Sequence, residues 1–541
     1  MVVSVVAKLF ALSISWWLFC GYPWTNVQGE YFSSVEQMRQ LLKLEQTLLE
    51  SLDRYIKLHE QKIEFLHRQR DLFGKELKEG LKHDVEYTSN PMSAFLLVNR
   101  LVTDWERIRR FMEMDVGVKL QNNTEMPTVD DLVGIAEGLA RLQDMYQLDT
   151  KAMASGKLFD RKVGRQLKTA ECYEIGNKLT SATNYRYAVS WLRESLRLWT
   201  TESPGVSKVE VMNALAYALS NQGEYEEALE LTNKVLKLQP DNQRALNSKE
   251  PLEKWIEYKK EHGLPPPVPD ANYKNYPSLC RGDYQRSTKE VAKLRCRYEH
   301  NRTPFLRIAP LKLEELNHDP FIVVYHEVLY AKEIATLLDI AKPLLHRSMV
   351  GDDVQKKVSK TRTSNNGWLD DVMHPVVRTI SRRTEDMTDL AMSAAEQLQV
   401  GNYGVGGHYL PHHDYAVPEE GKEAYPAVGK GNRIATVMYY LSDVAIGGAT
   451  VFPELGVGVF PRKGSAIFWY NLHANGSIDA RTLHGACPVF VGSKWGKSRY
   501  VVVACHNEAA HSQYFIFTVA NKWIHEYGQE FRRPCQIDQK V

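Results

Sequence analysis

The apolar residues of this 541-residue chain follow two different periods, and the change from one to the other constrains the fold most. Up to about residue 260 they recur at helical spacing. Beyond Phe321 they form short β-branched and aromatic runs that are separated by glycines, which is typical of strands. The pattern predicts an α+β multidomain protein in which helical domains precede an all-β core.

The composition limits the class of protein and the class of partner. With 43% hydrophobic and 25% charged residues, wholly disordered and collagen-like chains are excluded. The 68 basic and 66 acidic residues nearly cancel, which gives no case for nucleic acid or another polyanion as a partner. Seven cysteines are too few for a disulfide scaffold in a chain this long, although they are enough for a disulfide or two.

Residues 1–29 are predicted to be a secretory signal peptide. A short basic region precedes roughly twelve apolar residues, and small residues follow at Val27 and Gly29. A membrane anchor is the alternative, but this stretch is shorter than the ~20 residues that a span needs. We expect a mature chain that begins at Glu30 in a secretory compartment. Three glycosylation sequons fit that compartment: Asn122, Asn301 and Asn475.

Residues 30–150 are predicted to be a helical region. From Ser33 to about Gly80 apolar side chains recur every seven residues, with further ones three residues on. These positions are Leu42, Leu49, Leu52, Ile56, Ile63 and Leu66. The stripe either packs on a sister subunit, which makes this a dimerisation region, or belongs to an intramolecular helical bundle. The sequence leaves both open. After Asn90-Pro91 a second helix is expected over Ala94–Met114.

Residues 151–260 contain an internal repeat. In each copy two small residues lie twelve positions apart, where two helices would cross closely: Gly176 with Ala188, and Ala216 with Ala228. The second copy, residues 213–241, resembles a tetratricopeptide repeat. Two such helix pairs form a concave face that suits an extended peptide, so a peptide-binding domain is favoured over a helical spacer.

Residues 261–320 begin with a proline-rich stretch and are expected to be a linker, with the β domain over residues 321–541. The expected strands are Ile434–Leu441, Ala449–Phe452, Gly458–Phe460 and Ala466–Tyr470. The helices expected before them are Glu333–Leu345 and Glu385–Gln399.

Three residues of the β domain carry the predicted chemistry. His412 and Asp414 lie two positions apart and share one face of an extended chain, while His484 follows in a later strand. Two imidazoles and a carboxylate form the ligand set of non-haem Fe(II) oxygenases. Zinc is the competing metal, but structural zinc sites prefer thiolates and four protein ligands. Lys494 would supply a positive charge for the remote carboxylate of a chelating co-substrate.

Longer motifs around these residues resemble the α subunits of collagen prolyl 4-hydroxylase. They are residues 402–407, 431–436, 447–453, 468–471, 484–489 and 528–535, and the resemblance extends over nearly the whole chain. It implies a helical dimerisation region, a tetratricopeptide-like peptide-binding domain and a double-stranded β-helix (jelly-roll) oxygenase domain. The implied activity is that of a procollagen-proline 4-dioxygenase, which uses Fe(2+), O2 and 2-oxoglutarate and releases succinate and CO2.

The resemblance also implies L-ascorbate as a cofactor, the endoplasmic reticulum lumen as the location, and protein disulfide isomerase as the β subunit of an α2β2 tetramer. His412, Asp414 and His484 match the Fe(II) ligands, and Lys494 matches the residue that binds the C5 carboxylate of 2-oxoglutarate. The other matches are Tyr403 and Thr436 in the co-substrate pocket, Tyr409, Tyr217, Arg244 and Trp523 at the substrate peptide, and the disulfides Cys280–Cys296 and Cys487–Cys535.

The chain departs from this family in its peptide-binding domain. Thr180, Ser248 and Pro251 stand where tyrosine, asparagine and tyrosine are expected. Because aromatic rings stack on proline, the loss of two rings should weaken or redirect the recognition of proline-rich chains.

A second departure is an insertion at residues 496–518, because the family runs directly from Lys494-Trp495 into Val519. A retained intron would explain it, since the codons at both of its ends can encode splice sites; a genuine loop is the alternative. The insertion separates Lys494 from Trp523, so reduced or absent turnover is expected for the 541-residue form.

Other functions therefore stay open beside the hydroxylase. One is a catalytically impaired peptide-binding or chaperone-like subunit, which the insertion favours. The other is a hydroxylase that acts on a non-collagen luminal protein, or on another residue such as lysine. The intact set of His412, Asp414, His484 and Lys494 favours an enzyme.

Overall fold

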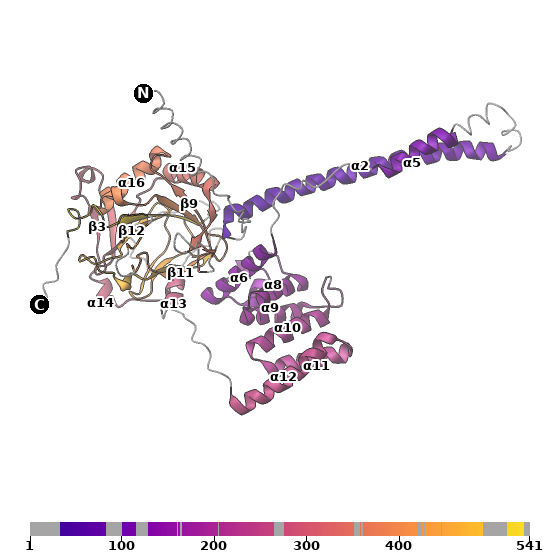
Figure 1. Ribbon diagram of the computed structural model, residues 1–541, viewed down its shortest axis with the longest axis horizontal. Coiled ribbons are helices and arrows are strands. Elements are labelled where there is room, and N and C mark those ends of the chain that lie inside the picture. Colours follow the sequence, from indigo (N-terminus) through magenta and orange to yellow (C-terminus); the bar gives the residue numbers. More distant parts are fainter. Residues whose placement is uncertain are drawn as a thin grey trace, which may run out of the picture. The chain divides into compact units, whose positions relative to one another are not determined.

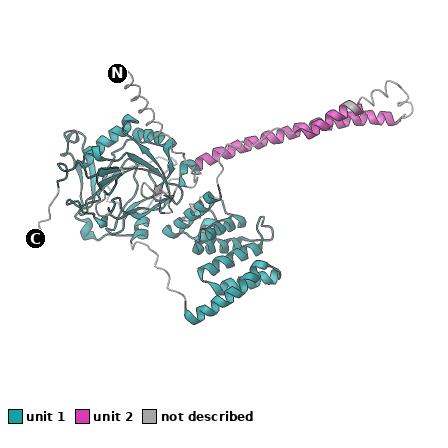
Figure 2. Cartoon of the chain, viewed as in Figure 1, with its two compact units in different colours: residues 1–37, 127–541 teal, residues 38–126 magenta. Residues whose placement is uncertain are grey.

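The chain divides into two compact units, one formed by residues 38–126 and the other by residues 1–37 and 127–541 (Figure 2). The computed structural model describes residues 33–82, 100–114, 128–159, 161–162, 165–203, 205–263, 275–350, 357–358, 361–418, 423–426, 428–444, 446–490 and 517–534. The predicted signal peptide, Asn122, Lys494 and Cys535 lie outside these residues.

The smaller unit is built on one long helix, as the seven-residue repeat predicted. Its elements are α2 (Val35–Lys82), a turn of π-helix η2 (Arg100–Asp104) and α5 (Trp105–Glu113). Helix α5 packs on the second half of α2, with ring centroids of Phe65 and Phe111 4.5 Å apart. Side chains of the stripe on α2 stay 45–68% exposed: Leu42, Leu49, Leu52, Ile56 and Ile63. The intramolecular pairing therefore leaves this stripe uncovered in the described residues.

The repeat region is a stack of helices, confirming the tetratricopeptide-like prediction (Figure 1). Its helices are α6 (Val129–Tyr146), α7 (Thr150–Ala154), α8 (Thr169–Ser181), α9 (Tyr185–Leu198), α10 (Lys208–Gln222), α11 (Tyr225–Leu238) and α12 (Gln243–His262), with a short hairpin of β1 (Lys157–Leu158) and β2 (Arg161–Lys162). Small residues let α8 and α9 approach closely, because a Cβ on Gly176 would lie 2.6 Å from Leu192 Cγ. Ala188 and Ala228 are completely buried at the corresponding crossings.

The C-terminal region forms two sheets, in the orders β3-β4-β5-β16-β12-β19-β10-β9-β6 and β11-β17-β14-β15. The strands of the larger sheet are β3 (Cys296–Glu299), β4 (Leu311–Asn317), β5 (Ile322–His326), β6 (His346–Arg347), β9 (Asn365–Leu369), β10 (Leu398–Asn402), β12 (Arg433–Tyr440), β16 (Ala466–Tyr470) and β19 (Thr518–His525). Those of the smaller are β11 (Tyr409–His412), β14 (Thr450–Phe452), β15 (Val457–Val459) and β17 (His484–Ala486). Short pairs add β7 (Met349–Val350) with β8 (Lys357–Val358), and β13 (Ile446–Gly447) with β18 (Val489–Phe490).

Two cores use the two faces of the larger sheet. One face packs on α15 (Ala331–Ala341) and α16 (Pro375–Thr388), and Val437 of β12 shares one core with Leu337 and Ile380 of these helices. The opposite face packs on the smaller sheet, where Met438 and Phe452 belong to a second core. The expected jelly-roll domain is thus a sandwich with helices on its outer face, and the strands expected from residue 434 to residue 470 are confirmed within a residue or so.

One predicted helix, Glu385–Gln399, is wrong. Helix α16 begins earlier, because His374 Nδ1 accepts a hydrogen bond from the amide of Val376 and Pro375 occupies the first turn. It ends at Thr388, where Asp389 turns left-handed with φ of 59°. The residues that follow lead into β10, whose backbone groups pair with β19 on one side and with β9 on the other.

The expected disulfides are also wrong. Cys280 is bonded to Cys487, with their Cα atoms 5.5 Å apart, which excludes both Cys280–Cys296 and Cys487–Cys535. The reason is tertiary: α13 (Tyr276–Arg281) packs on β14 and β15 and buries Cys280 in the same core as Cys487. Cys296 lies exposed on β3, where β3 and β4 extend the sheet earlier than residue 321.

Short helical segments complete the elements: α14 (Thr288–Val291), η3 (Phe305–Arg307), η4 (Lys342–Leu344), η5 (Met392–Ala394) and η6 (Ala480–Thr482). In the part of the chain that the structure describes, no helix combines the length and the hydropathy that crossing a bilayer requires.

The close contact at Gly176 gives a test of the repeat packing. Gly176→Ala should weaken the packing of α8 on α9 by about 1–3 kcal/mol, since its Cβ would overlap Leu192. Gly74→Ala in α2 is the control, because no atom of the described residues lies within 4 Å of where its Cβ would be, and alanine favours a helix. Amide hydrogen exchange in each helix measures the opening free energy. Unchanged exchange in α8 and α9 would contradict the predicted overlap.

Candidate active site

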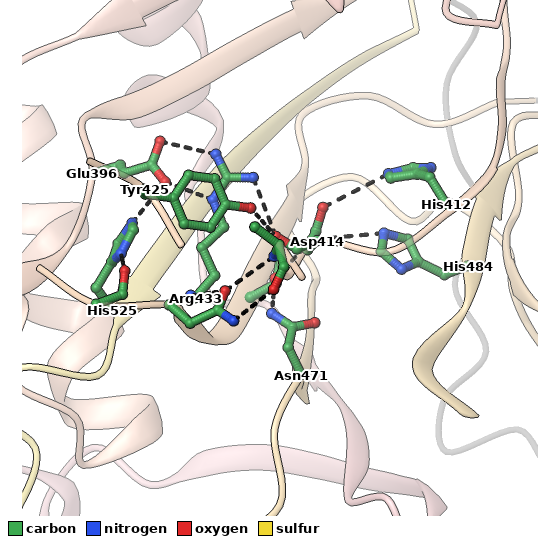
Figure 3. Close-up of polar contacts among 12 residues, drawn as sticks. Glu396, His412, Asp414, Tyr425, Arg433, Asn471, His484 and His525 are labelled. Carbon is green, nitrogen blue, oxygen red and sulfur yellow. Dashed lines mark hydrogen bonds and ion pairs between the residues drawn. The ribbon is translucent and has the colours of Figure 1, made fainter. Parts of the chain in front are cut away.

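Strands β11 and β17 bring the three predicted metal ligands together (Figure 3). His412 and His484 are register partners in this antiparallel pair, and Asp414 follows two residues after His412. Asp414 Oδ1 lies 3.7 Å from His412 Nε2, and Asp414 Oδ2 lies 3.6 Å from His484 Nε2. One ligand atom from each of the three lies within 4.8 Å of the others, the only such group of His, Cys, Asp and Glu among the described residues.

Backbone contacts orient both imidazole rings. His412 Nδ1 lies 2.8 Å from the carbonyl oxygen of Leu410, and His484 Nδ1 lies 3.0 Å from that of Thr482. A carbonyl oxygen only accepts, so each Nδ1 carries the hydrogen and donates it. Each Nε2 lone pair is then left pointing toward Asp414, as a divalent cation requires. Burial and the neighbouring His484 lower the pKa of His412 to about 3, which keeps that ring neutral.

A chain of buried hydrogen bonds orients the Asp414 carboxylate. Thr436 Oγ1 donates to Asp414 Oδ2 over 2.8 Å and accepts from Asn471 Nδ2 over 2.9 Å. Asn471 Oδ1 in turn accepts from Trp469 Nε1 over 2.8 Å. Burial alone would raise the pKa of Asp414, but His484 and His412 hold it at about 2. Thr436, expected in the co-substrate pocket, thus contacts the carboxylate itself.

The donor set fits a divalent iron better than a structural zinc. It offers one nitrogen from each of two imidazoles and one ionised carboxylate, with no thiolate or fourth protein ligand in the group. Cys487 directly follows β17, but it is bonded to Cys280 and is therefore not available as a metal ligand. Aromatic rings shield the group, with the Trp469 and Phe452 centroids 4.7 and 5.6 Å from that of His484.

A second polar cluster lies on the other side of Asp414 (Figure 3). Arg433 Nε donates to Glu396 Oε1 over 2.6 Å, and Tyr425 Oη donates to the backbone oxygen of Asp414 over 2.6 Å. His525 places Nε2 2.9 Å from Glu396 Oε1 and Nδ1 2.8 Å from the oxygen of Gly431, so both nitrogens face acceptors. Burial opposes the ionisation of Glu396, but His525 and Arg433 together hold its pKa below the usual value.

Sequence reasoning missed the roles of this second cluster. Arg433 lies inside a motif that was recognised, but no spacing rule connects it with Glu396 or His525. These residues come from β12, the approach to β10 and β19, which are neighbours only in the folded sheet.

The remaining predicted residues lie in three places. Tyr409 stacks on His412 with ring centroids 3.5 Å apart, and Trp523 lies under the Arg433 guanidinium at 4.1 Å. Trp523 Nε1 is buried, and its N–H lies close enough to Asp414 to help lower the pKa of that carboxyl. Tyr403 is 4% exposed inside the sandwich. Tyr217 and Arg244 lie outside this site, on α10 and α12 of the helical repeat, and Lys494 is not among the described residues.

Three family descriptions match the chain in order. Residues 34–160 match the prolyl 4-hydroxylase α-subunit N-terminal region, residues 169–257 match the prolyl 4-hydroxylase peptide-substrate-binding domain, and residues 398–504 match the 2OG-Fe(II) oxygenase superfamily. The last of these covers His412, Asp414 and His484. The fold and the site therefore define an Fe(II)- and 2-oxoglutarate-dependent oxygenase.

Comparison with known proteins shows which family of these oxygenases the chain resembles. The human prolyl 4-hydroxylase subunit α-1 is 36% identical over 96% of this chain and 97% of its own. The α-1 subunit of Caenorhabditis elegans is 36% identical over 94% of this chain and 91% of its own. The chain belongs to the family of prolyl 4-hydroxylase α subunits, which makes it a 2-oxoglutarate-dependent prolyl hydroxylase. A viral collagen prolyl hydroxylase from Paramecium Bursaria Chlorella virus-1 aligns structurally with a TM-score of 0.26 at 22% identity, over 38% of this chain and 94% of its own.

The hydrogen bond from Thr436 can be tested by metal binding. Thr436→Val should weaken Fe(II) affinity about 10–100-fold, because it removes the donor that fixes Asp414 Oδ2. Thr450→Val is the control, since it removes a buried hydroxyl that bonds Tyr440 and not the metal ligands. Anaerobic Fe(II) titration gives both affinities. Equal losses of Fe(II) affinity in the two variants would show a general effect on the folding of the domain instead.

Proposed function

We propose that this chain is the catalytic subunit of a procollagen-proline 4-dioxygenase, with His412, Asp414 and His484 as the ligands of Fe(2+). The observation that carries the proposal is the convergence of their three ligand atoms within 4.8 Å, with each ring turned by a backbone carbonyl. Bound iron and 2-oxoglutarate would supply the activation of O2 that leads to hydroxylation at C4 of a peptidyl proline, with succinate and CO2 as co-products.

The protein groups around the ligands position the reactants and exclude water. The Thr436–Asn471–Trp469 chain fixes the carboxylate, so it needs no reorganisation when a metal enters. Tyr409 and Trp523 flank this group and are proposed to contact the substrate peptide.

The proposed setting is the endoplasmic reticulum lumen. The predicted signal peptide supports it, as do the exposed sequons at Asn301 and Asn475 and the Cys280–Cys487 disulfide, which persists in an oxidising compartment. L-Ascorbate is proposed as a further cofactor, and protein disulfide isomerase as the β subunit of an α2β2 tetramer. The exposed stripe on α2 suits a second α subunit, because solvent exposure of such a stripe is unfavourable.

Collagen-like peptides test this function directly. With Fe(II), 2-oxoglutarate and a (Pro-Pro-Gly)n peptide, the tetramer should form 4-hydroxyproline and succinate in equal amounts. Asp414→Ala or His484→Ala should lower the rate by more than about a hundredfold, because each removes a metal ligand. His413→Ala is the control, since its ring stacks on Tyr415 and lies outside the ligand group. No hydroxyproline from this peptide, with iron and 2-oxoglutarate bound, would contradict the proposal.

A second candidate is a catalytically impaired form, and Phe517 favours it. Phe517 is 2% exposed and shares the inner core of the sandwich with Val519, because alternate residues of a strand face the same side. If residues 494–495 ran directly into Val519, Lys494 would take the strand position that Phe517 occupies. That position lies beside Tyr403, whose ring centroid is 5.4 Å from that of Phe517.

An aromatic ring at this position offers no charge to the remote carboxylate of 2-oxoglutarate. Burial of an unpaired carboxylate costs several kcal/mol, so the 541-residue form is proposed to bind the co-substrate weakly. It would still present the helical repeat to peptides, as the chaperone-like alternative requires.

Removal of residues 496–518 tests this second candidate. The shortened chain should bind 2-oxoglutarate about 10–100-fold more tightly, since a charged hydrogen bond replaces an apolar contact. Calorimetry on the metal-loaded protein measures the affinity independently of turnover. Lys494→Ala in the shortened chain is the control and should return the affinity to the weak value. Full affinity and full activity of the 541-residue form would refute the impairment, and transcripts that all carry the insertion would exclude a retained intron.

A further inference from the structure

Helix α12 carries an exposed ladder of aromatic rings formed by Trp255, Tyr258 and His262, with Tyr225 of α11 behind it. Trp255 stacks on Tyr225 with centroids 5.7 Å apart and planes inclined by 13°. Tyr258 meets Trp255 edge-on at 5.6 Å and stacks on His262 at 4.4 Å. Trp255 and Tyr258 are each 49% exposed, so both offer ring surface to solvent. We call these four residues the α12 ladder.

The ladder continues the face of α12 that carries Arg244 and Ser248. At 100° per residue, the positions 244, 248, 251, 255, 258 and 262 fall within about 40° of a common direction. Arg244 lies near the partly buried Tyr173 of α8. Burial raises the pKa of Tyr173, and the positive charge of Arg244 acts in the opposite direction. This face of α12 therefore adjoins the inner side of the repeat. The domain description ends at residue 257, whereas α12 runs on to His262.

The packing behind the ladder makes it rigid. Tyr225 is partly buried and packs against the apolar core of the repeat, and Lys259 Nζ pairs with Glu226 Oε2 at 3.0 Å across the same two helices. The Lys259 ammonium lies 5.9 Å from the centroid of the Tyr225 ring. Trp255 is therefore held by Tyr225 while about half of its surface stays exposed, and this preorganisation lowers the entropy that binding a ligand would cost.

The chemistry of this face selects one occupant. Aromatic rings without a strong net charge are the surface on which polyproline II segments dock, because proline rings stack on them and the backbone stays extended. The charged residues of α12 are five basic and four acidic, which gives neither an acidic nor a basic peptide an advantage. The stripe lacks the leucine, isoleucine or valine side chains that a helix of a second copy would pack against.

Dimensions agree with this occupant. Trp255 and His262 are seven residues apart, or ~10.5 Å along the helix, close to the ~9.3 Å of one polyproline II turn. From Arg244 to His262 the stripe measures ~27 Å, the length of about nine residues of such a segment.

We propose that the α12 ladder is an extension of the peptide-binding face, which grips a proline-rich segment of the substrate chain about one polyproline turn beyond Pro251. This inference rests on the proposed function, since it assigns a substrate contact to the same hydroxylase. It also explains how a chain with Thr180 and Pro251 in place of aromatic residues holds proline-rich substrates: the rings lie farther along α12.

The test is direct binding to the full chain in its tetramer, with the double variant Trp255→Ala, Tyr258→Ala. A (Pro-Pro-Gly)n peptide of about thirty residues, ~93 Å long, should bind about tenfold more weakly to the variant by calorimetry. A peptide of about six residues, ~19 Å long, should show the same KM and kcat with the variant and the wild-type protein. The long peptide should show a raised KM and an unchanged kcat.

Two controls separate the ladder from a loss of fold or of exposed rings in general. The single variant Trp255→Phe should keep most of the affinity for the long peptide, since an aromatic ring remains at that position. Tyr298→Ala removes a 57% exposed ring of β3 and should leave the affinity for the long peptide unchanged. Equal affinity of the double variant and the wild-type protein for the long peptide would overturn the inference, and so would no binding of that peptide to the wild type. Binding that depends on the ladder, without hydroxyproline formation, would leave the ladder intact and refute the hydroxylase.

Discussion

The structure of the C-terminal domain depends on the burial of one carboxylate, that of Asp414, which is 5% exposed. A buried carboxylate is tolerable only where charges or donors surround it. Here the donors come from β12 and β16 through Thr436, Asn471 and Trp469, and the imidazoles come from β11 and β17. Four strands from both sheets must therefore be in register before this group is satisfied.

Strand register links the site to the core. Along β12, Thr436 shares its face with Met438 and Tyr440 of the inner core, while Ala435 and Val437 face the helices. A shift by one residue would exchange these faces, burying Thr436 against the helices and leaving Asp414 without its donor. The hydrophobic alternation that folds the sheet thus also places the hydroxyl that orients the metal ligand.

The features that could be predicted from the sequence are those that depend on the spacing of neighbouring residues. His412 and Asp414 share a face because they are two residues apart, and the strand Ala466–Tyr470 follows from its apolar run. Prediction from the sequence failed where the disulfide or hydrogen-bond partner of a residue lies far away along the chain. Cys280 meets Cys487 over 207 positions, and Glu396 meets His525 over 129, and nothing local to either residue indicates the other. The helix expected over residues 385–399 failed for a related reason, because β10 is held by two neighbouring strands.

Strand β19 shows which features of the residues around it the fold itself requires. It lies between β12 and β10 in the larger sheet, so its backbone must pair on both edges. Thr518 pairs with Asn402, and the Asn402 amide also donates to the carbonyl oxygen of Phe517 over 3.3 Å, so the last residues of the insertion satisfy the sheet. Backbone pairing does not distinguish a phenylalanine from a lysine, whereas an anionic co-substrate does. Selection for folding alone would accept either residue at this position, and only selection for catalysis requires the cation.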